Sequence, residues 1–563
     1  MELAEAARAA VEAGLTGGAS DAEGYALQQR SREVRVHAGK VESLSAATER
    51  GVGLRAWIGG RAGYAFGTDL SDQGLRELGS RVVTAARIAD EDEHAAAPEA
   101  DGDYPRLDGL RDSAIADWPA DRLVELTLAV ERAATSHDPR VGNIEQAVYA
   151  DDDDEVAIHS STGIECSYEA SNCYAYVNAL GGDEDSREPG LGFGLARAPS
   201  GLDADAIGVE GAERAAAMIG AEKPESRACP VVFDPTVAAS FAGLIGSALG
   251  ADSVQRGRSP FADLLGEEVA SEALVLHDDG LETEGLAASP CDDEGIPRAR
   301  TALIEGGRLR TFLQDAYTAR RSGADRAGNA RRGGYRTPPS VGTSNLIVQS
   351  GSATTVELLA MAGDGVYVTD IAGLHAGVNP VNGVFSVGAS GRLIKSGELA
   401  DPVREFTIAS DLVSMLQAVR EAGSEARWVP FGGVVRTPPL LIAEMTIGGN
   451  GPVALAVRLR ATSTAGGGFD VTKAEFLDRL ANDERLGSKK AAGEAVDAVL
   501  DTITSVLRGG GEVNFTGFGK FHVAERGPRQ GVNPRTGERI TIPGGKVPRF
   551  SAGSALKSNV KGG

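Results

Sequence analysis

Basic residues gather close to the end of a chain that is otherwise acidic. From residue 466 to the end there are 15 Lys and Arg against 11 Asp and Glu, a net charge of +4, whereas residues 1–465 carry 41 against 69, a net charge of −28. The basic residues lie among Gly and Pro turn residues, and the candidate polyanion-binding set is Arg526, Arg529, Asn533, Pro534, Arg535, Thr536, Arg539, Lys546 and Arg549. A cationic, turn-rich segment on an acidic chain is typical of a binding site for a polyanion.

Length and composition predict a multidomain globular protein. The chain has 563 residues, of which 42% are hydrophobic and 24% charged. Its first 14 residues have no apolar core of a signal peptide, and the uncharged run 235–251 is too short and too weakly apolar to span a bilayer. We therefore expect a cytoplasmic protein without membrane contact. Its four cysteines form no CxxC pair and are expected to be reduced and buried: Cys166, Cys173, Cys229 and Cys291.

The first part of the chain is predicted to be an α+β domain spanning residues 1–222. Alternation of apolar and polar residues predicts strands, and apolar stripes at helical spacing predict helices. The expected strands are 25–30, 33–38, 41–49, 52–58 and further strands over 143–177, and the expected helices are 72–89, 120–136 and 204–219. The acidic run Asp151–Glu155 lacks the spacing and the glycine of a calcium loop, so we interpret it as a solvated acidic turn.

The rest of the chain predicts a β-rich domain over 223–460, a linker at 461–468 and a small domain over 469–563. The β-rich domain begins with a strand at 231–233 and a helix at 237–249. The linker is Gly-rich, and a capping box at Thr472–Glu475 marks the start of the last domain. That domain is expected to contain a helix at 488–508, strands at 512–515, 519–525 and 546–550, and a final helix at 551–560.

The last domain resembles the HU/IHF family of bacterial nucleoid proteins. The resemblance rests on residues at fixed spacing around the basic segment: Gly517, Phe518, Phe521, Arg526, Arg529, Gly531, Asn533, Pro534 and Thr536. It implies a helical homodimer whose two β-hairpin arms clasp double-stranded DNA in the minor groove, with Pro534 wedged between base steps. The arginines would contact phosphates and release counterions. The alternative is a basic surface hairpin that binds nothing.

Residues 1–460 resemble the TldD/PmbA family of two-subunit metallopeptidases. The matching segments are 39–42, 51–55, 257–259, 291–295, 313–320, 328–330 and 373–383. The catalytic subunit of that family carries HExxxH on the helix after the strand that corresponds to 231–233, which would supply zinc ligands and a general base. Here the helix at 237–249 contains no His, Glu or Cys. The chain is therefore similar to the PmbA/TldE branch, so we expect no catalytic or metal-binding residue and no cofactor, with zinc only in a catalytic partner.

A second candidate site is a peptide groove containing Asp292, Asp293, Glu294, His375 and Asn379. Three adjacent acids could bind a peptide amine or a metal, but they could equally form a tight loop in which the carboxylates cap backbone N–H groups. We favour the loop. A single imidazole cannot make a zinc site, so His375 is interpreted as a structural or groove residue.

These features predict an HU-like DNA-binding module, nucleoid-associated, joined to a non-catalytic subunit of a TldD-type peptidase complex. The expected fold class is α+β: a two-domain body followed by a helical dimerisation domain with a β-hairpin arm. The expected partners are DNA, a second copy through the last domain, and a relative that bears HExxxH. Two alternatives stay open: an active zinc metallopeptidase with unrecognised ligands, and an architectural scaffold.

Overall fold

The structure, a computed structural model, describes most of the first 450 residues and parts of the last domain. The described residues are 1–99, 102–183, 186–324, 327–430, 433–450, 496, 502, 505–509, 511–515, 519–526, 529–532, 539–542 and 545–552. The chain divides into two compact units, Met1–Val457 and Arg458–Gly563. In the described part of the chain, no helix has the length and apolar character needed to cross a membrane.

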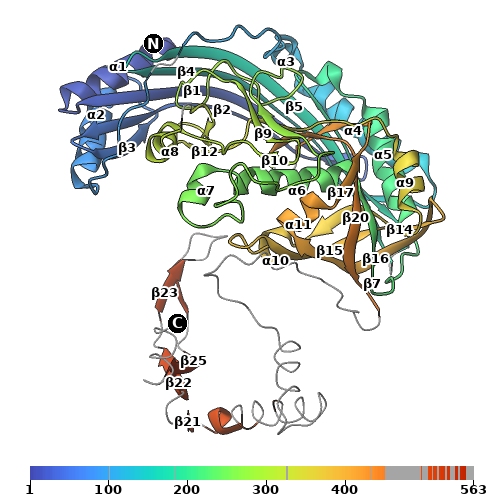
Figure 1. The fold of residues 1–563 in the computed structure, drawn as a ribbon. Helices are drawn as coiled ribbons and strands as arrows, with labels where there is room; N and C mark the ends of the chain where they lie inside the picture. Colours follow the sequence, from blue (N-terminus) through green and yellow to red (C-terminus); the bar gives the residue numbers. More distant parts are fainter. Residues whose placement is uncertain are drawn as a thin grey trace. The chain divides into compact units, whose positions relative to one another are not determined.

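One long, curved antiparallel sheet organises the first half of the larger unit (Figure 1). Its strand order is β3-β2-β1-β4-β5-β6. The strands are β1 (Asp21–His37), β2 (Lys40–Ile58), β3 (Arg61–Gly67), β4 (Asn143–Ser160), β5 (Glu165–Gly181) and β6 (Glu188–Ala196). The sequence predicted four short strands where β1 and β2 run unbroken. Gly51 lies inside β2 and does not mark a turn. It serves a close contact, because a Cβ at this position would lie 2.4 Å from the ring of Tyr335.

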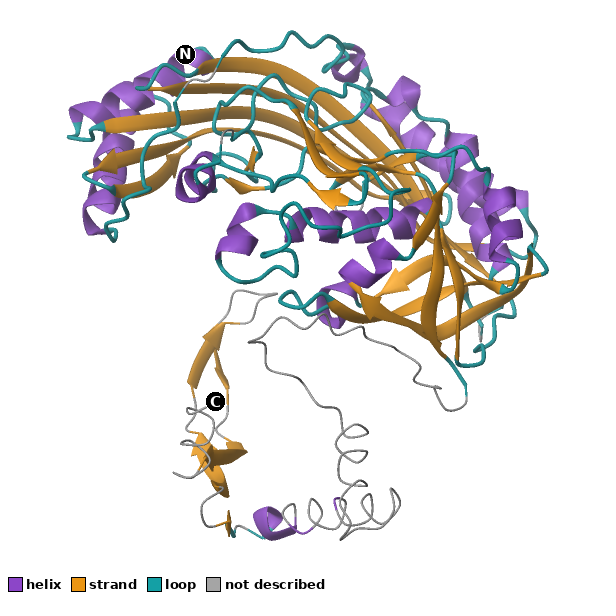
Figure 2. Ribbon diagram, viewed as in Figure 1, coloured by secondary structure: helices purple, strands orange, loops and turns teal. Residues whose placement is uncertain are grey.

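Two groups of helices cover the outer face of this sheet (Figure 2). The helices are α1 (Leu3–Thr16), α2 (Asp72–Ile88), α3 (Ala114–Asp117), α4 (Ala120–His137) and α5 (Ala204–Ala217). Leu3, Val11 and Leu78 of α1 and α2 share one core with β1 and β2, while Leu123 and Ile207 of α4 and α5 share another with β4 and β5. The α+β class and the helices α2, α4 and α5 are as predicted.

The acidic run lies inside β4 and is not a turn. Asp151 is only 3% exposed, and Arg32 on the adjacent β1 lies 2.6 Å from its carboxylate. Arg111 forms a second ion pair with Asp153, at 2.6 Å. The prediction of a solvated turn was wrong because arginines far away in the sequence neutralise these acids.

The second half of the larger unit contains two sheets of six strands each. The first has the order β16 (Glu398–Asp411), β15 (Val384–Lys395), β14 (Gly365–Ala372), β7 (Arg227–Phe233), β20 (Leu440–Gly448) and β17 (Val419–Ala422). A further pairing between β16 and β20 closes five of these strands into a ring. The second has the order β10 (Arg308–Leu309), β9 (Arg300–Glu305), β8 (Leu276–Asp279), β13 (Asn345–Val348), β19 (Val434–Thr437) and β18 (Arg427–Val429).

Helix α6 (Pro235–Ala248) follows β7 and contributes to the core that both sheets share. Asp234 caps the start of this helix by accepting from Thr236 N. The remaining elements are α7 (Ala251–Gln255), α8 (Ala316–Ser322), β11 (Ala330–Arg331), β12 (Ser340–Val341), α9 (Thr355–Ala362), α10 (Leu374–Gly377) and α11 (Leu412–Gln417).

The cysteines depart from expectation in one respect. All four are buried, as predicted, and Cys173 and Cys229 are free thiols. Cys166 of β5 and Cys291, however, form a disulfide that spans 125 residues of sequence. The prediction that every cysteine is reduced was therefore wrong, since residues without CxxC spacing are brought together by the packing of the two halves of the larger unit.

The smaller unit contains β21 (Val513–Phe515), β22 (Gly519–Arg526), β23 (Arg529–Val532), β24 (Arg539–Ile542) and β25 (Gly545–Ala552). The strands follow the predicted order, but β25 continues through Ser551 and Ala552, where the sequence predicted the start of a helix. Residues 496, 502 and 505–508 are helical. The predicted capping box at 472–475 lies outside the described residues.

Candidate functional site

Five of the candidate basic residues of the last domain lie in two pairs of antiparallel strands, β22 with β25 and β23 with β24. In β22 and β25, Arg526 is opposite Gly545, and in β23 and β24, Arg529 is opposite Ile542 and Val532 is opposite Arg539. The register does not change from one strand pair to the next. The two pairs therefore share one register, although they belong to separate sheets, β21-β22-β25 and β23-β24; we call the two pairs together the ribbon.

This ribbon carries five of the candidate residues. Arg526 ends β22, Arg529 begins β23, Arg539 begins β24, and Lys546 and Arg549 lie in β25, where Arg549 is exposed. The other four candidates, Asn533, Pro534, Arg535 and Thr536, lie outside the described residues. A two-stranded ribbon with cations on both strands has the form that β-ribbon readers place in a DNA groove.

The three acids of the second candidate site form a buried loop. Asp292 is fully buried and accepts three backbone N–H hydrogen bonds, from Glu294, Ile296 and Ala330, each 2.9 Å long. Burial raises the pKa of Asp292, and the neighbouring charge of Glu294 raises it further. The carboxylate thus acts as an internal brace for three segments of backbone.

The neighbouring carboxylates of Asp293 and Glu294 also accept hydrogen bonds from backbone N–H groups. Asp293 accepts from the backbone N–H of Arg332 at 2.7 Å, and Glu294 accepts from that of Ala316 at 2.7 Å. Both side chains are at most 5% exposed. The interpretation as a loop whose carboxylates cap backbone N–H groups is confirmed, whereas a role in binding a peptide stays a prediction.

His375 and Asn379 differ from the acids in accessibility. Both are exposed, His375 on α10 and Asn379 on the following loop. The Asn379 side chain accepts from Val381 N at 2.9 Å and so closes a turn. The structure does not join the five groove candidates into one accessible surface, because three of them are buried and two are exposed.

A buried ion network that sequence reasoning missed anchors this loop to the long sheet. Glu23 of β1 is fully buried and binds two arginines, Arg332 at 2.7 Å and Arg55. Arg55 also binds Glu294 at 2.8 Å. The partners are separated by as many as 309 positions in the sequence, so no local pattern could have revealed the network.

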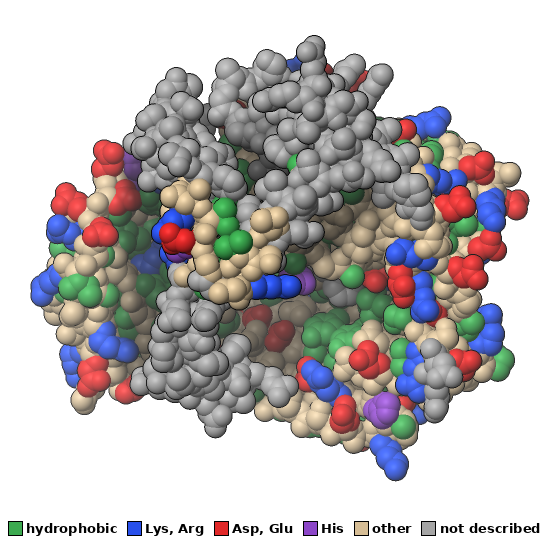
Figure 3. Space-filling view, turned by 90° about the horizontal axis from the view of Figure 1, so that it is seen from below, with side chains coloured by type: hydrophobic (Ala, Val, Ile, Leu, Met, Phe, Trp, Pro, Cys, Tyr) green, Lys and Arg blue, Asp and Glu red, His purple; other side chains and the backbone are tan. Residues whose placement is uncertain are grey.

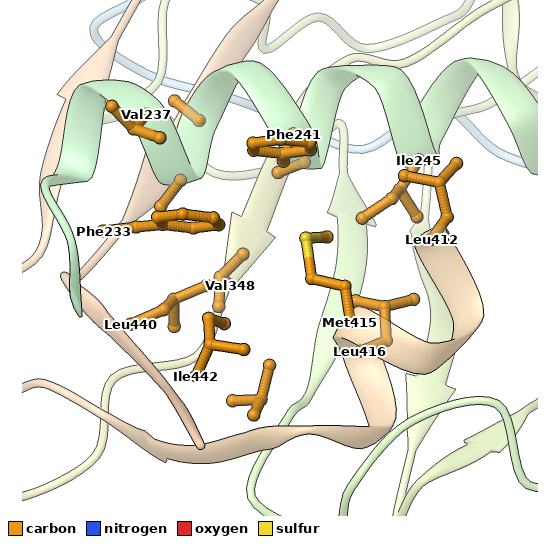
Figure 4. Close-up of a cluster of buried hydrophobic side chains, with 14 of the residues drawn as sticks. Phe233, Val237, Phe241, Ile245, Val348, Leu412, Met415, Leu416, Leu440 and Ile442 are labelled. Carbon is orange, nitrogen blue, oxygen red and sulfur yellow. The ribbon is translucent and has the colours of Figure 1, made fainter. Parts of the chain in front are cut away.

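Helix α6 presents an apolar surface to the core. Figure 4 shows Phe241 and Ile245 of the helix near Met415 and Leu412, and Val237 near Phe233 at the start of the helix. The rings of Phe233 and Phe241 stack with centroids 5.2 Å apart. Nothing on this side of the helix can donate to a metal or move a proton.

Comparisons with known proteins agree with this architecture. Residues 22–86, 114–219 and 226–449 match the models of PmbA/TldA metallopeptidase domain 1, central domain and C-terminal domain. A "Metalloprotease PmbA homolog" of Haemophilus influenzae is 27% identical, over 80% of this chain and 97% of its own length, and "Metalloprotease PmbA" of Escherichia coli O157:H7 is 26% identical, over 79% and 96%.

The chain belongs to the PmbA/TldD family. Solved structures agree on the fold: TldE of Thermococcus kodakarensis and a putative modulator of a DNA gyrase from Thermotoga maritima each have a TM-score of 0.72 at 23% identity. They cover 79% of this chain and 100% and 99% of their own lengths, respectively. Residues 471–561 match the model of bacterial DNA-binding proteins, so an HU-type domain follows the PmbA/TldD part.

The described residues of this PmbA/TldD chain do not offer the ligand set of a catalytic zinc. Such a site needs three protein ligands and an open position for water. Helix α6 supplies none, and within the part of the chain that the structure describes no group of three His, Cys, Asp or Glu side chains is arranged to hold a metal.

The PmbA/TldD part also contains a cavity that the sequence did not predict. It has a volume of about 420 Å³ and lies between α5 and β6 on one side and the start of α6 and β14 on the other. Its lining includes Arg214, Ser240 and Asp370. Arg214 is already paired with Asp234 and Glu210, each at 3.1 Å, so its charge is neutralised within the fold.

Proposed function

We propose that this protein binds double-stranded DNA through its last domain, with little regard to sequence, and brings a non-catalytic PmbA/TldE-like subunit to it. The observation that carries the proposal is the shared register of the two strand pairs, β22 with β25 and β23 with β24, with basic residues on both strands of each pair. Its binding energy would come mainly from phosphate contacts that release counterions, and bending of the duplex from Pro534 at the tip.

The charge of the larger unit is consistent with DNA binding by the last domain alone. It is strongly acidic, and on the face seen in Figure 3 acidic and basic side chains are interspersed, with no single-sign basic patch. Such a surface does not attract a polyanion. The DNA contact therefore falls to the last domain, which we expect to dimerise so that two ribbons hold one duplex.

The larger unit is proposed to act as a partner for a homologous subunit that bears HExxxH. Its relatives in Haemophilus influenzae and Escherichia coli are named metalloproteases. The apolar face of α6 supports a structural role for this chain within such a complex, because it offers no zinc ligand.

DNA binding is tested with the full chain by fluorescence anisotropy on a short duplex at several salt concentrations. We expect similar affinities for unrelated sequences and a log K that falls by about 0.9 per phosphate contact for each log unit of salt. Pro534→Ala should weaken the preference for bent or nicked duplexes over straight ones and leave the salt slope unchanged. An affinity that does not depend on salt would reject the proposal.

The peptidase role is tested by metal analysis and peptide turnover. We expect substoichiometric zinc in the purified chain, DNA binding that survives a chelator, and no peptide hydrolysis until a relative with HExxxH is added. Stoichiometric zinc with chelator-sensitive hydrolysis by this chain alone would favour the alternative, an active metallopeptidase.

A further inference from the structure

The first half of β2 is an open sheet edge. Lys40–Glu49 are all exposed, although they lie in a strand of 19 residues. On one side this segment pairs with β1, but β3 pairs only with Val52–Ile58, and no other strand among the described residues lies along the outer side. Long free edges are rare in folded proteins because their unpaired N–H and C=O groups recruit another strand.

Two features limit the regular part of this edge to seven residues. At one end, Arg35 pairs with Ser43 and Val36 with Val41, so Glu42 is an extra, bulged residue that interrupts the ladder. At the other end Arg50 is half-buried and donates to Met1 O at 2.6 Å. The regular, fully exposed segment is therefore Ser43–Glu49, and its central residue is Ala46.

The edge also carries an apolar side chain and a hollow that would receive it. Leu44 is 48% exposed and lies on the same face of the sheet as Ala46 and Thr48, since these three pair with Val34, Arg32 and Arg30. On this face a hollow of about 260 Å³ is bounded by Ala46, Thr48 and the α3 residues Ile115 and Ala116, among others. Leu44 and the hollow thus lie on the same edge of the sheet, since Ala46 and Thr48 at the hollow are two and four residues from Leu44.

We propose that Ser43–Glu49 pairs antiparallel with the same segment of a second copy about a two-fold axis at Ala46. Directly opposed residues of an antiparallel pair lie on the same face, so the axis must pass through a residue, and Ala46 is the centre of the free segment. In this register Leu44 of each copy lies opposite Thr48 of the other and fills its hollow. Ser43 lies opposite Glu49, where its hydroxyl can donate to the carboxylate.

A second copy fits this edge better than an unrelated extended peptide. A peptide would be held by backbone hydrogen bonds and by one side chain in the hollow, but it need not offer Leu44 a hollow in return. In the two-fold pair the Leu44 side chain of each copy is buried in the hollow of the other copy, so the same contact occurs twice. Such self-complementarity is characteristic of an isologous interface.

The test is site-specific cross-linking of the full chain with a short bismaleimide. The native free thiols Cys173 and Cys229 are buried, so an introduced cysteine is the reactive one. Ala46→Cys lies on the proposed axis and should cross-link to its own copy. Adding Leu44→Asp should slow that cross-linking at least about tenfold, because it removes the apolar contact on both sides of the axis.

Two controls separate edge pairing from association through the HU-type domain. Arg76→Cys, on the exposed surface of α2, reports background collisions between copies that the other domain holds together. Val356→Asp replaces a residue on α9 that is 72% exposed, and combined with Ala46→Cys it should leave the cross-linking rate unchanged. Unfolding midpoints of all variants should match the parent chain, since each altered side chain is on the surface.

Three results would overturn the proposal. The Ala46→Cys variant could cross-link no faster than Arg76→Cys, or equally fast with and without Leu44→Asp. It could also cross-link to another chain or a peptide in place of its own copy, which would assign the edge to a different strand.

Discussion

The acidic run of β4 and the basic ribbon of the last domain use charge in opposite ways. Asp151 and Asp153 look like a surface feature in the sequence, yet Arg32 and Arg111 neutralise them within the fold. Residues 526–549 hold Arg and Lys with only Glu538 as an acid among them, and one further acid of the ribbon, Glu525 of β22, stands opposite Lys546. A charged run therefore indicates a ligand only where the rest of the chain does not supply its counterions. Charges of the ribbon should affect binding, and charges inside the larger unit should affect stability.

The largest expected effect is on DNA affinity. Replacing Arg529, Arg535 and Arg539 by Ala should lower the salt dependence of log K by about 2.7 and the affinity by roughly 10² to 10³ at moderate salt, because three phosphate contacts are lost. The measurement is an anisotropy titration of the full chain between low and moderate salt. The matched control is Arg300→Ala, Arg308→Ala and Arg310→Ala, on or beside β9 and β10 of the larger unit, which should leave binding unchanged. An unaltered salt slope in the ribbon variant would remove these arginines from the interface.

The sequence predicted elements better than contacts. Helices α2, α4 and α5 were found because apolar residues recur at helical spacing and each helix buries that stripe. The acids Asp292–Glu294 were correctly interpreted as a capping loop, since carboxylates beside a glycine favour local backbone hydrogen bonds. The Glu23 network, the disulfide and the place of Asp151 escaped prediction because each depends on residues more than 100 positions away.

Glu23→Ala should produce the largest change in stability. It leaves Arg55 and Arg332 in the interior without their shared carboxylate, and breaking a buried ion pair in this way costs about 3–5 kcal/mol. Urea denaturation of the full chain, followed by a signal of the larger unit, measures it. The matched control is Glu165→Ala, which breaks the exposed pair with Arg8 and should cost at most about 1 kcal/mol. Equal losses in the two variants would mean that burial does not distinguish these charges.

Removing the disulfide should have a somewhat smaller effect. Cys166 and Cys291 join β5 to the residue just before the acidic loop, and cross-links of this kind stabilise by about 2–4 kcal/mol, mainly by restricting the unfolded chain. A reductant should lower the free energy of unfolding of the parent chain by that amount. In the Cys166→Ala, Cys291→Ala variant the reductant should have no effect. Equal sensitivity of both proteins would show that the disulfide does not contribute.

The smallest expected effect concerns Asp154, which lies in the acidic run but lacks an arginine partner. Burial raises the pKa of Asp154 to about 7, and the negative charge of Asp152 adds to the shift. Between the ordinary aspartate pKa and about 7 the folded state binds more protons than the unfolded state at this position.

The contribution of Asp154 to stability therefore falls as the pH rises from about 4 to about 7. Asp154→Asn removes the ionisable group, so its stability relative to the parent chain should increase by about 1–3 kcal/mol between pH 5 and pH 8. Urea denaturation at the two pH values measures the difference, and taking the difference cancels the titration of all other groups. Asp90→Asn, at an exposed position, should show no such change. If the advantage of Asp154→Asn is the same at both pH values, Asp154 is solvated like the acids of the surface, and the contrast between the paired and unpaired members of the run disappears.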